Sequence, residues 1–485
     1  MGRKGQAAGF NTALRVMLDE ADMTNTALAL AVVLVGAEEG IHVGTNTTAI
    51  RRMLDGSQPH WPVPRLVAKA LSRRLRREVD VAACGFADRA PVTEDVHDGL
   101  SCAGTLDGTV RTVAKLSGRD MNRRKFLLGS SFSAAAFSQP ALFALTVPPV
   151  ESTARRGGGV RVGMAEVALL TDQVTNMRQL DFRYGAAAGL REQVVVLVHH
   201  EANQLLHASY SDKTGRALLT AVAQATKLAG FTAADVGRHA LAQRYLVQAL
   251  DLAMAAGDRR YAADVLSAMS RITAQIGQNA LTEHDRLQHG RQAVALARAG
   301  LTVTQGTATP VQTAELHALE ARGFALLGDT REAHRAMLAA QRCYESMCPD
   351  DEPPWLRLHY TEAAFAADLG KCLCDLGEAE EAIKQSTIAV RDYEPWQVRP
   401  RCFAQTDLAA AHLLGRDFEQ AAASGRAALR TAAEVRSTRA LDRLSTLQRQ
   451  IKPLRTNSPH LRELDGRITT LLTRSDTHRN ETFTV

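Results

Sequence analysis

Apolar residues recur at helical spacing along most of the chain, and short polar turns separate these stretches. Near the start, Leu14, Met17 and Leu18 share one helical face behind a polar residue that suits a helix N-terminus. The pattern predicts four N-terminal helices, over residues 11–23, 25–34, 46–56 and 63–77. Aromatic residues make up only 5% of the chain while Ala and Leu are abundant, which favours helix over sheet.

Breaks in this pattern divide the chain into three parts, and the fold class they predict is all-α. Residues 11–86 have the pattern of a small helical domain. Residues 87–162 contain Pro-Pro and Gly-Gly-Gly, which are typical of a linker. Residues 163–473 are apolar at helical spacing almost throughout, with short turns that contain Gly or Asp. The remaining tail is polar, and we expect it to fray.

The small N-terminal domain resembles the Cro/repressor-type (XRE) helix-turn-helix. Its second helix begins M-T-N-x-x-L-A and its third ends I-R-R-M-L-D-G. In that family the third helix lies in the major groove, where its N-terminal residues contact base edges. The residues expected to face DNA are Asn46, Thr47, Thr48, Arg51 and Arg52. The residues expected to contact phosphates are Lys69, Arg73 and Arg74, together with Arg65, Arg76 and Arg77.

One departure from the family pattern leaves an alternative open. The connection between the second and third helices, "GAEEGIHVGT", is about ten residues long, whereas the motif normally has a turn of three or four. The angle of the third helix is therefore uncertain. The alternative interpretation is a small helical domain that docks a protein, with a basic face that is merely solvated.

The C-terminal region contains copies of one helix-pair template. Each copy has a small residue in a first helix, a turn with Gly and an acidic residue, and Ala in a second helix. Four segments fit, at residues 227–250, 319–341, 367–390 and 407–429. They resemble tetratricopeptide (TPR) repeats, although their spacing exceeds the 34 residues of that family and residues 250–300 match poorly. The prediction is a TPR-like solenoid over residues 163–473.

A solenoid of this type has a concave groove lined by its first helices. Lys227, Arg322 and Lys371 are expected to point into it. These cations predict a site for an acidic peptide or protein segment. The alternative is a basic face that binds only water.

No motif in the chain indicates an enzyme. "HHEANQLLH" at His199 to His207 lacks the second histidine of a zinc protease helix, because Gln204 stands four residues after His200. The glycines of "RRGGGVRVG" match neither a dinucleotide nor a phosphate-binding loop. We therefore expect no catalytic residues, no metal and no cofactor. The seven cysteines lack zinc-ribbon spacing and indicate reduced thiols.

The middle segment, residues 122–150, contains a twin-arginine-like motif, "NRRKFLLGSSFSAAA". Three interpretations are open: an apolar linker helix packed on the solenoid, a membrane tether, or an export signal. Residues 126–150 carry no charge and are long enough for a span, but serines, Gln139 and three prolines oppose insertion. The first ten residues lack the apolar core of a secretory signal, so we expect a cytoplasmic protein without membrane contact.

The run from His199 to Arg271 resembles a family of actinomycete regulators with an XRE-type helix-turn-helix and a TPR-like C-terminal region. The resemblance implies a transcriptional regulator that binds double-stranded DNA, of the type that controls sporulation and antibiotic production. A net charge of +6 permits such binding without requiring it. The hypothesis is that a protein or peptide in the groove changes the spacing of two DNA-binding modules, which a homodimer would supply. The alternative function is a TPR adaptor that does not bind DNA.

Overall fold

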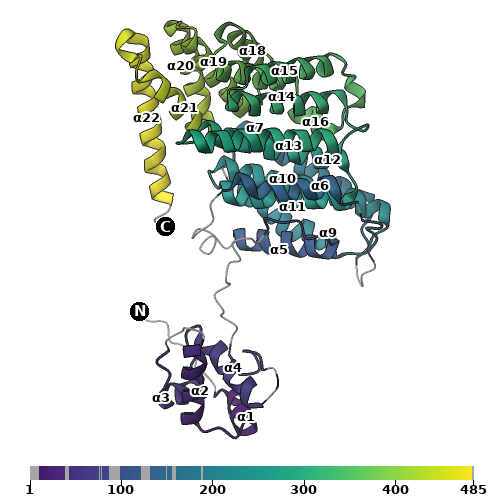
Figure 1. Cartoon of the computed structure of the whole chain (residues 1–485), viewed down its shortest axis with the longest axis vertical. Helices are drawn as coiled ribbons and strands as arrows, with labels where there is room; N and C mark the ends of the chain where they lie inside the picture. Colours follow the sequence, from purple (N-terminus) through teal and green to yellow (C-terminus); the bar gives the residue numbers. More distant parts are fainter. Residues whose placement is uncertain are drawn as a thin grey trace. The chain divides into compact units, whose positions relative to one another are not determined.

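The computed structural model describes residues 10–38, 43–75, 77, 79–86, 99–121, 132–148, 150–155, 160–186 and 189–482. Over these ranges the chain is helical and has no β-strand, with only two isolated bridges, Arg155 to Tyr210 and Arg161 to Ser209. The all-α prediction is therefore confirmed. The chain separates into two compact units, residues 1–95 and 96–485, which are described one at a time (Figure 1).

Within its described residues the first unit contains four helices: α1 (Thr12–Glu20), α2 (Asn25–Glu38), α3 (Thr47–Leu54) and α4 (Val63–Leu75). Its core forms where their apolar faces meet, and Leu14, Leu28, Ile50, Leu66 and Leu71 are fully buried there. Asparagine side chains fix two helix starts. The Oδ1 of Asn11 accepts a hydrogen bond from the backbone N–H of Leu14, and that of Asn46 accepts one from Ala49, both at 2.9 Å.

The second unit contains the remaining helices. Its first part holds α5 (Leu106–Met121), η1 (Ala134–Phe137), α6 (Ser138–Thr146), α7 (Met164–Tyr184), α8 (Leu190–Val196), η2 (Leu197–Ala202) and α9 (Asn203–His207). Six longer helices follow: α10 (Asp212–Asp235), α11 (His239–Ala256), α12 (Arg259–Gln278), α13 (Glu283–Val303), α14 (Pro310–Leu327) and α15 (Thr330–Glu345). The last part holds η3 (Pro349–Asp351), α16 (Pro354–His359), α17 (Glu362–Leu376), α18 (Ala379–Asp392), α19 (Val398–Leu414), α20 (Phe418–Glu434), α21 (Thr438–Ile451), η4 (Arg455–Asn457) and α22 (Pro459–Thr482).

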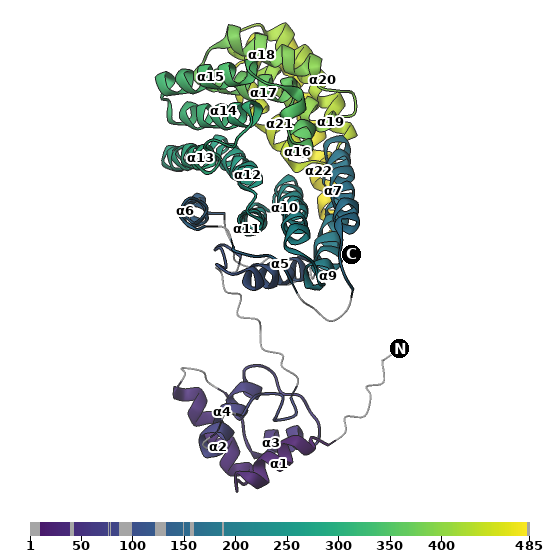
Figure 2. The same ribbon diagram turned by 90° about the vertical axis from the view of Figure 1, so that its right-hand side faces the viewer.

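Consecutive long helices pack as pairs, and small residues allow their close approach. The pairs are α10 with α11, α12 with α13, α14 with α15, α17 with α18, and α19 with α20 (Figures 1 and 2). A Cβ at Gly370 would lie 2.7 Å from the Ser386 hydroxyl on the neighbouring helix. A Cβ at Gly323 would lie 2.6 Å from Val294. The template alanines are buried as well, at residues 242, 249, 333, 340, 382, 389, 421 and 428.

The turns between paired helices explain why one copy departs from the template. Gly237, Gly328 and Gly377 have positive φ angles of 80°, 74° and 86°, a backbone conformation that costs glycine little. In the fourth copy Gly415 stands one place early and has a φ of −73°. Arg416 takes the left-handed position there instead, with a φ of 61°. The turn geometry is thus kept although the glycine is displaced.

Much of the segment predicted as a linker, residues 87–162, is folded into the second unit. Val110, Val113 and Leu116 of α5 are buried in its largest core, because they recur at helical spacing on one face. Phe137 is fully buried in the same core, and α6 packs against α11 and α13. The twin arginines lie outside the described residues. Over the described part of the chain no single helix has the length and hydropathy of a membrane span.

Helix α7 joins two parts of the second unit that are far apart in the sequence. It packs against α10 and also against α19 (Figure 2). At its last residue, Tyr184, the carbonyl oxygen accepts a hydrogen bond from the backbone N–H of Arg436 at 2.9 Å. The helix pairs therefore curve until α19 and α21 meet α7, and the first helices of the pairs face a shared interior.

The burial of Phe137 predicts that η1 and α6 contribute to the stability of the second unit. Replacing Phe137 with Ala should lower the free energy of unfolding by about 3–5 kcal/mol, because a fully buried ring leaves a cavity. Urea denaturation of the full chain, followed by circular dichroism, measures this loss. Leu142→Ala is the matched control on α6, where the side chain is 59% exposed, and should change stability by less than about 0.5 kcal/mol. Equal effects of the two variants would contradict the packing of this segment.

Candidate functional site

The first candidate surface is the polar side of α3. Ile50, Met53 and Leu54 are buried against the other helices of the first unit, so the opposite side of α3 faces solvent. Its exposed residues are Asn46, Thr48, Arg51 and Arg52. Thr47 is half-buried, and its hydroxyl lies 3.2 Å from that of Thr26 at the start of α2. Four of the five residues predicted to face DNA are therefore accessible, and the fifth joins the starts of α2 and α3.

The basic residues of α4 divide into two groups. Lys69 and Arg73 are exposed on the helix. Arg74 is also exposed, but its Nε donates a hydrogen bond to the carbonyl oxygen of Ala21 at 3.0 Å. Arg77 forms an ion pair with Glu20 of α1 at 2.7 Å. Arg74 and Arg77 thus help to hold α4 against the end of α1, a structural role that the sequence interpretation did not include.

The second candidate site is a cavity of about 130 Å³ inside the second unit. It has room for roughly four water molecules at about 30 Å³ each. Its lining comes from α7 and from the inward-facing helices α10, α12, α14, α16, α17, α19 and α21. All three residues predicted to point into a groove, Lys227, Arg322 and Lys371, line this cavity.

Each of these three cations already has a carboxylate partner. Lys227 forms a short ion pair with Asp264. Arg322 Nη1 lies 3.1 Å from Asp368 Oδ1, and Lys371 Nζ lies 2.6 Å from Asp375 Oδ1. Burial lowers the pKa of the Lys227 ammonium, and Asp264 acts in the opposite direction. The cavity therefore contains a built ion-pair network, not the row of free cations that the sequence alone suggests.

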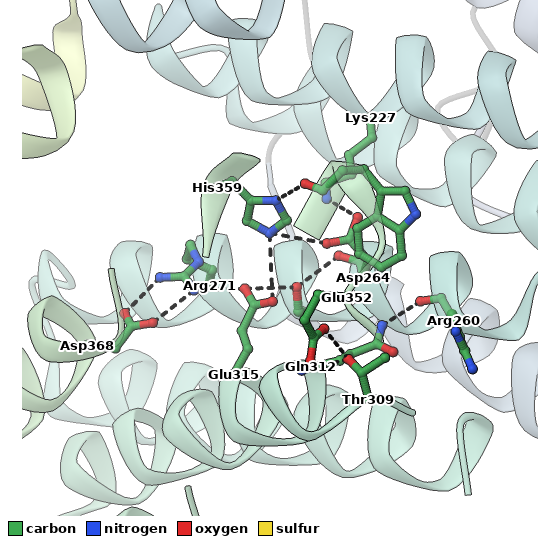
Figure 3. A network of polar contacts seen from close by, with 12 residues as sticks. Lys227, Arg260, Asp264, Arg271, Thr309, Gln312, Glu315, Glu352, His359 and Asp368 are labelled. Carbon is green, nitrogen blue, oxygen red and sulfur yellow. Dashed lines mark hydrogen bonds and ion pairs between the residues drawn. The ribbon is translucent and has the colours of Figure 1, made fainter. Parts of the chain in front are cut away.

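Figure 3 shows one part of this network, around His359 of α16. Its Nε2 lies 3.4 Å from Asp264 Oδ1 and 3.7 Å from Glu315 Oε2. Arg271 of α12 reaches Glu315 at 3.0 Å and Asp368 at 2.7 Å, and so links α14 to α17. Although burial opposes it, hydrogen bonding to His359 lowers the pKa of Glu315. Carboxylates and cations alternate here, which keeps the buried charges paired.

Asp264, Glu315 and His359 also have ligand atoms within 4.8 Å of one another, a spacing that suits a metal ion. Lys227 and Arg271 bind the two carboxylates, however, and a cation at this place would meet both positive charges. The chemistry of the donor set therefore favours the ion-pair network over a metal centre.

The other end of the cavity is built by arginines of α19 and α21. Arg399 binds Asp181 of α7 through two hydrogen bonds, at 2.6 and 2.7 Å, and lies 3.1 Å from Asp235 of α10. Arg443 pairs with Asp407 at 2.6 Å. Arg439 has no ion pair among the described residues. Its Nε donates a hydrogen bond to Gln275 Oε1 at 3.0 Å.

The surroundings of Arg439 disfavour its charge. Its side chain lies over the ring of Phe403, with the guanidinium carbon 5.2 Å from the ring centre. Burial and the nearby charge of Arg399 lower the pKa of Arg439 to about 9. Eight lysine or arginine side chains line the cavity against three carboxylates. Carboxylates behind the lining pair with several of these cations, whereas Asp181 and Asp235 attract Arg439 only from beyond ion-pair distance.

Sequence reasoning missed Arg271, Arg399, Arg439 and Arg443. Arg399 and the two arginines of α21 lie outside the segments that fit the helix-pair template. Arg439 and Arg443 stand four residues apart, so they share one helical face. That spacing was the available signal, but it is also common on solvated helices.

Comparison with known proteins gives one match. Residues 14–87 match the family described as SP15 N-terminal domain. This match covers the four helices of the first unit and none of the second. No curated protein matches the chain, and no solved structure matches it.

The buried pair of Arg399 gives a test of the network. Replacing Arg399 with Met should lower the free energy of unfolding by roughly 3–5 kcal/mol, because Asp181 and Asp235 lose their main counter-charge while remaining buried. Arg391→Met is the matched control. Arg391 also binds an aspartate, Asp392, but its side chain is 69% exposed, so little or no loss of stability is expected. Comparable losses in chemical denaturation would refute a special role for the buried pair.

Proposed function

We propose that this protein is a DNA-binding transcriptional regulator whose second unit receives a ligand. The observation that carries the proposal is the division of α3 into a buried apolar side and an exposed side with Asn46, Arg51 and Arg52. Asn and Arg make bidentate hydrogen bonds to adenine and guanine in the major groove. A short helix with these side chains, held by its apolar face, has the form of a recognition helix.

Two further features support DNA as the partner of the first unit. The Thr26–Thr47 contact brings the starts of α2 and α3 together, and helix N-termini favour phosphate. Lys69 and Arg73 add positive charge on α4. One feature departs from the helix-turn-helix motif: residues 39–46 connect α2 to α3, whereas the motif normally has a turn of three or four residues.

The paired helices and buried small residues of the second unit support a TPR-like repeat domain. We propose that its inner surface binds the partner, and that binding changes how two copies of the DNA-binding unit engage an operator. The resemblance to actinomycete regulators makes development and secondary metabolism the proposed area of control. The proposed location is the cytoplasm. A TPR-like adaptor without DNA binding is the competing proposal, since the inner surface alone would serve it.

DNA binding is tested by the double variant Arg51→Ala/Arg52→Ala. It should bind duplex DNA roughly tenfold more weakly or worse, because two direct contacts are lost. Fluorescence anisotropy over a range of salt concentrations measures this change, and the wild-type affinity should fall steeply with salt.

The matched control is Arg331→Ala/Arg335→Ala on α15, which removes the same charge from an exposed helix of the second unit. Its DNA affinity should stay within about twofold of the wild type if the position of the charge decides binding. If both double variants bind DNA equally more weakly than the wild type, net charge alone explains the loss of affinity, and α3 has no special role. Affinity unchanged in the α3 variant would favour the adaptor.

A further inference from the structure

At the end of the cavity formed by α19 and α21, one buried cation lacks a counter-charge among the described residues. Arg439 is only 7% exposed, lines the cavity, and has no carboxylate partner among the described residues. Its single hydrogen bond, from Nε to Gln275, leaves the two Nη groups available. An arginine is charged at neutral pH, and leaving that charge buried and unpaired destabilises the fold. The fold keeps this cost at a position where an apolar side chain would pack.

Other buried donors of the same cavity also lack partners within the described ranges. They are the hydroxyl of Tyr360 and the Nε atoms of Arg322, Arg399 and Arg443. Buried polar groups in native proteins are nearly always hydrogen-bonded, so these atoms mark this end of the cavity as polar and incompletely paired. All of these groups except Tyr360 are permanently donors, and the tyrosine can donate as well. Because Arg439 is a cation with no carboxylate partner among the described residues, the group that would complete it is a negatively charged acceptor.

We propose that this cavity binds a small anionic ligand, through a carboxylate or phosphate group seated against Arg439. The cavity of about 130 Å³ has room for such a group. Guanidinium groups bind carboxylates and phosphates with paired hydrogen bonds, and burial strengthens them. The proposal deepens the proposed function, because it names the chemistry of the partner of the second unit.

The position of Arg439 also gives the ligand a way to act on the fold. Arg439 belongs to α21, Gln275 to α12 and Arg399 to α19, so an anion there would bridge helices that are far apart in the sequence. The same region holds the contact of Ser437 with Asp235 and that of Arg436 with Tyr184, where α21 meets α10 and α7. Neutralising Arg439 would therefore hold the helix pairs in their curved arrangement.

The test is thermal denaturation of the full chain in phosphate, in acetate and in chloride at equal ionic strength and pH. Phosphate or acetate should raise the melting temperature by about 3 °C or more above chloride when present well above the dissociation constant. A short peptide with a free C-terminus, compared with its amidated form, separates a terminal carboxylate from free phosphate as the source. No difference between any of these anions and chloride would overturn the proposal.

The variant Arg439→Met gives a signature that a purely structural arginine would not give. Removing an unpaired buried charge should raise the melting temperature in chloride and abolish the response to the anion. Arg439→Gln should abolish the response too, while Arg391→Met, which removes an exposed arginine, should keep it. A lower melting temperature for both Arg439 variants, or a response that they retain, would overturn the proposal.

These readouts are independent of DNA. If the anions do not raise the melting temperature but the protein binds DNA, the proposed function is supported and the anion site is refuted. If the anions raise the melting temperature but the protein does not bind DNA, the anion site is supported and DNA binding is refuted. The two proposals therefore fail separately.

Discussion

The interaction on which the second unit depends is the buried ion pair of Arg399 with Asp181 and Asp235. It joins α19 to α7 and α10, and its partners are far apart in the sequence. Desolvating these charges is costly, and the bidentate hydrogen bonds between the Arg399 guanidinium and the Asp181 carboxylate offset that cost. Because this contact draws the two ends of the array of helix pairs together, it also determines that their inner helices enclose a small cavity.

That enclosure changes the chemistry of the inner surface. In an open groove, Lys227, Arg322 and Lys371 would meet water and attract an acidic segment over a broad face. In the cavity each is held by a carboxylate, from another helix for Lys227 and Arg322 and from α17 itself for Lys371, and specificity passes to the few groups left unsatisfied. Arg439 is the clearest case: it forms no ion pair among the described residues, and the attraction of Asp235 and Asp181 does not outweigh burial and the repulsion of Arg399.

The first unit follows a simpler rule. Apolar residues of four short helices form one core, and the polar side of α3 is left at the surface with arginines in its last turn. Arg74 and Arg77 show how a basic run can divide between structure and binding, since both contact α1 or the residue that follows it. The charges of such a run are therefore not equivalent, although the sequence presents them as one.

The sequence by itself determined the helices, the small residues at which they approach, and three of the cations that line the cavity. These features are local: spacing of 3.6 residues, left-handed turns and the need for Gly or Ala between helices. It offered an apolar helix packed on the solenoid for the segment that contains α6, but it did not reveal that α5 belongs to the core, nor that Arg399 and Arg439 belong to the site. Those depend on which helices meet across the interior, and pairing between residues about 200 positions apart leaves no periodic trace in the chain. Only the tertiary structure decided which charge is paired and which is left without a partner.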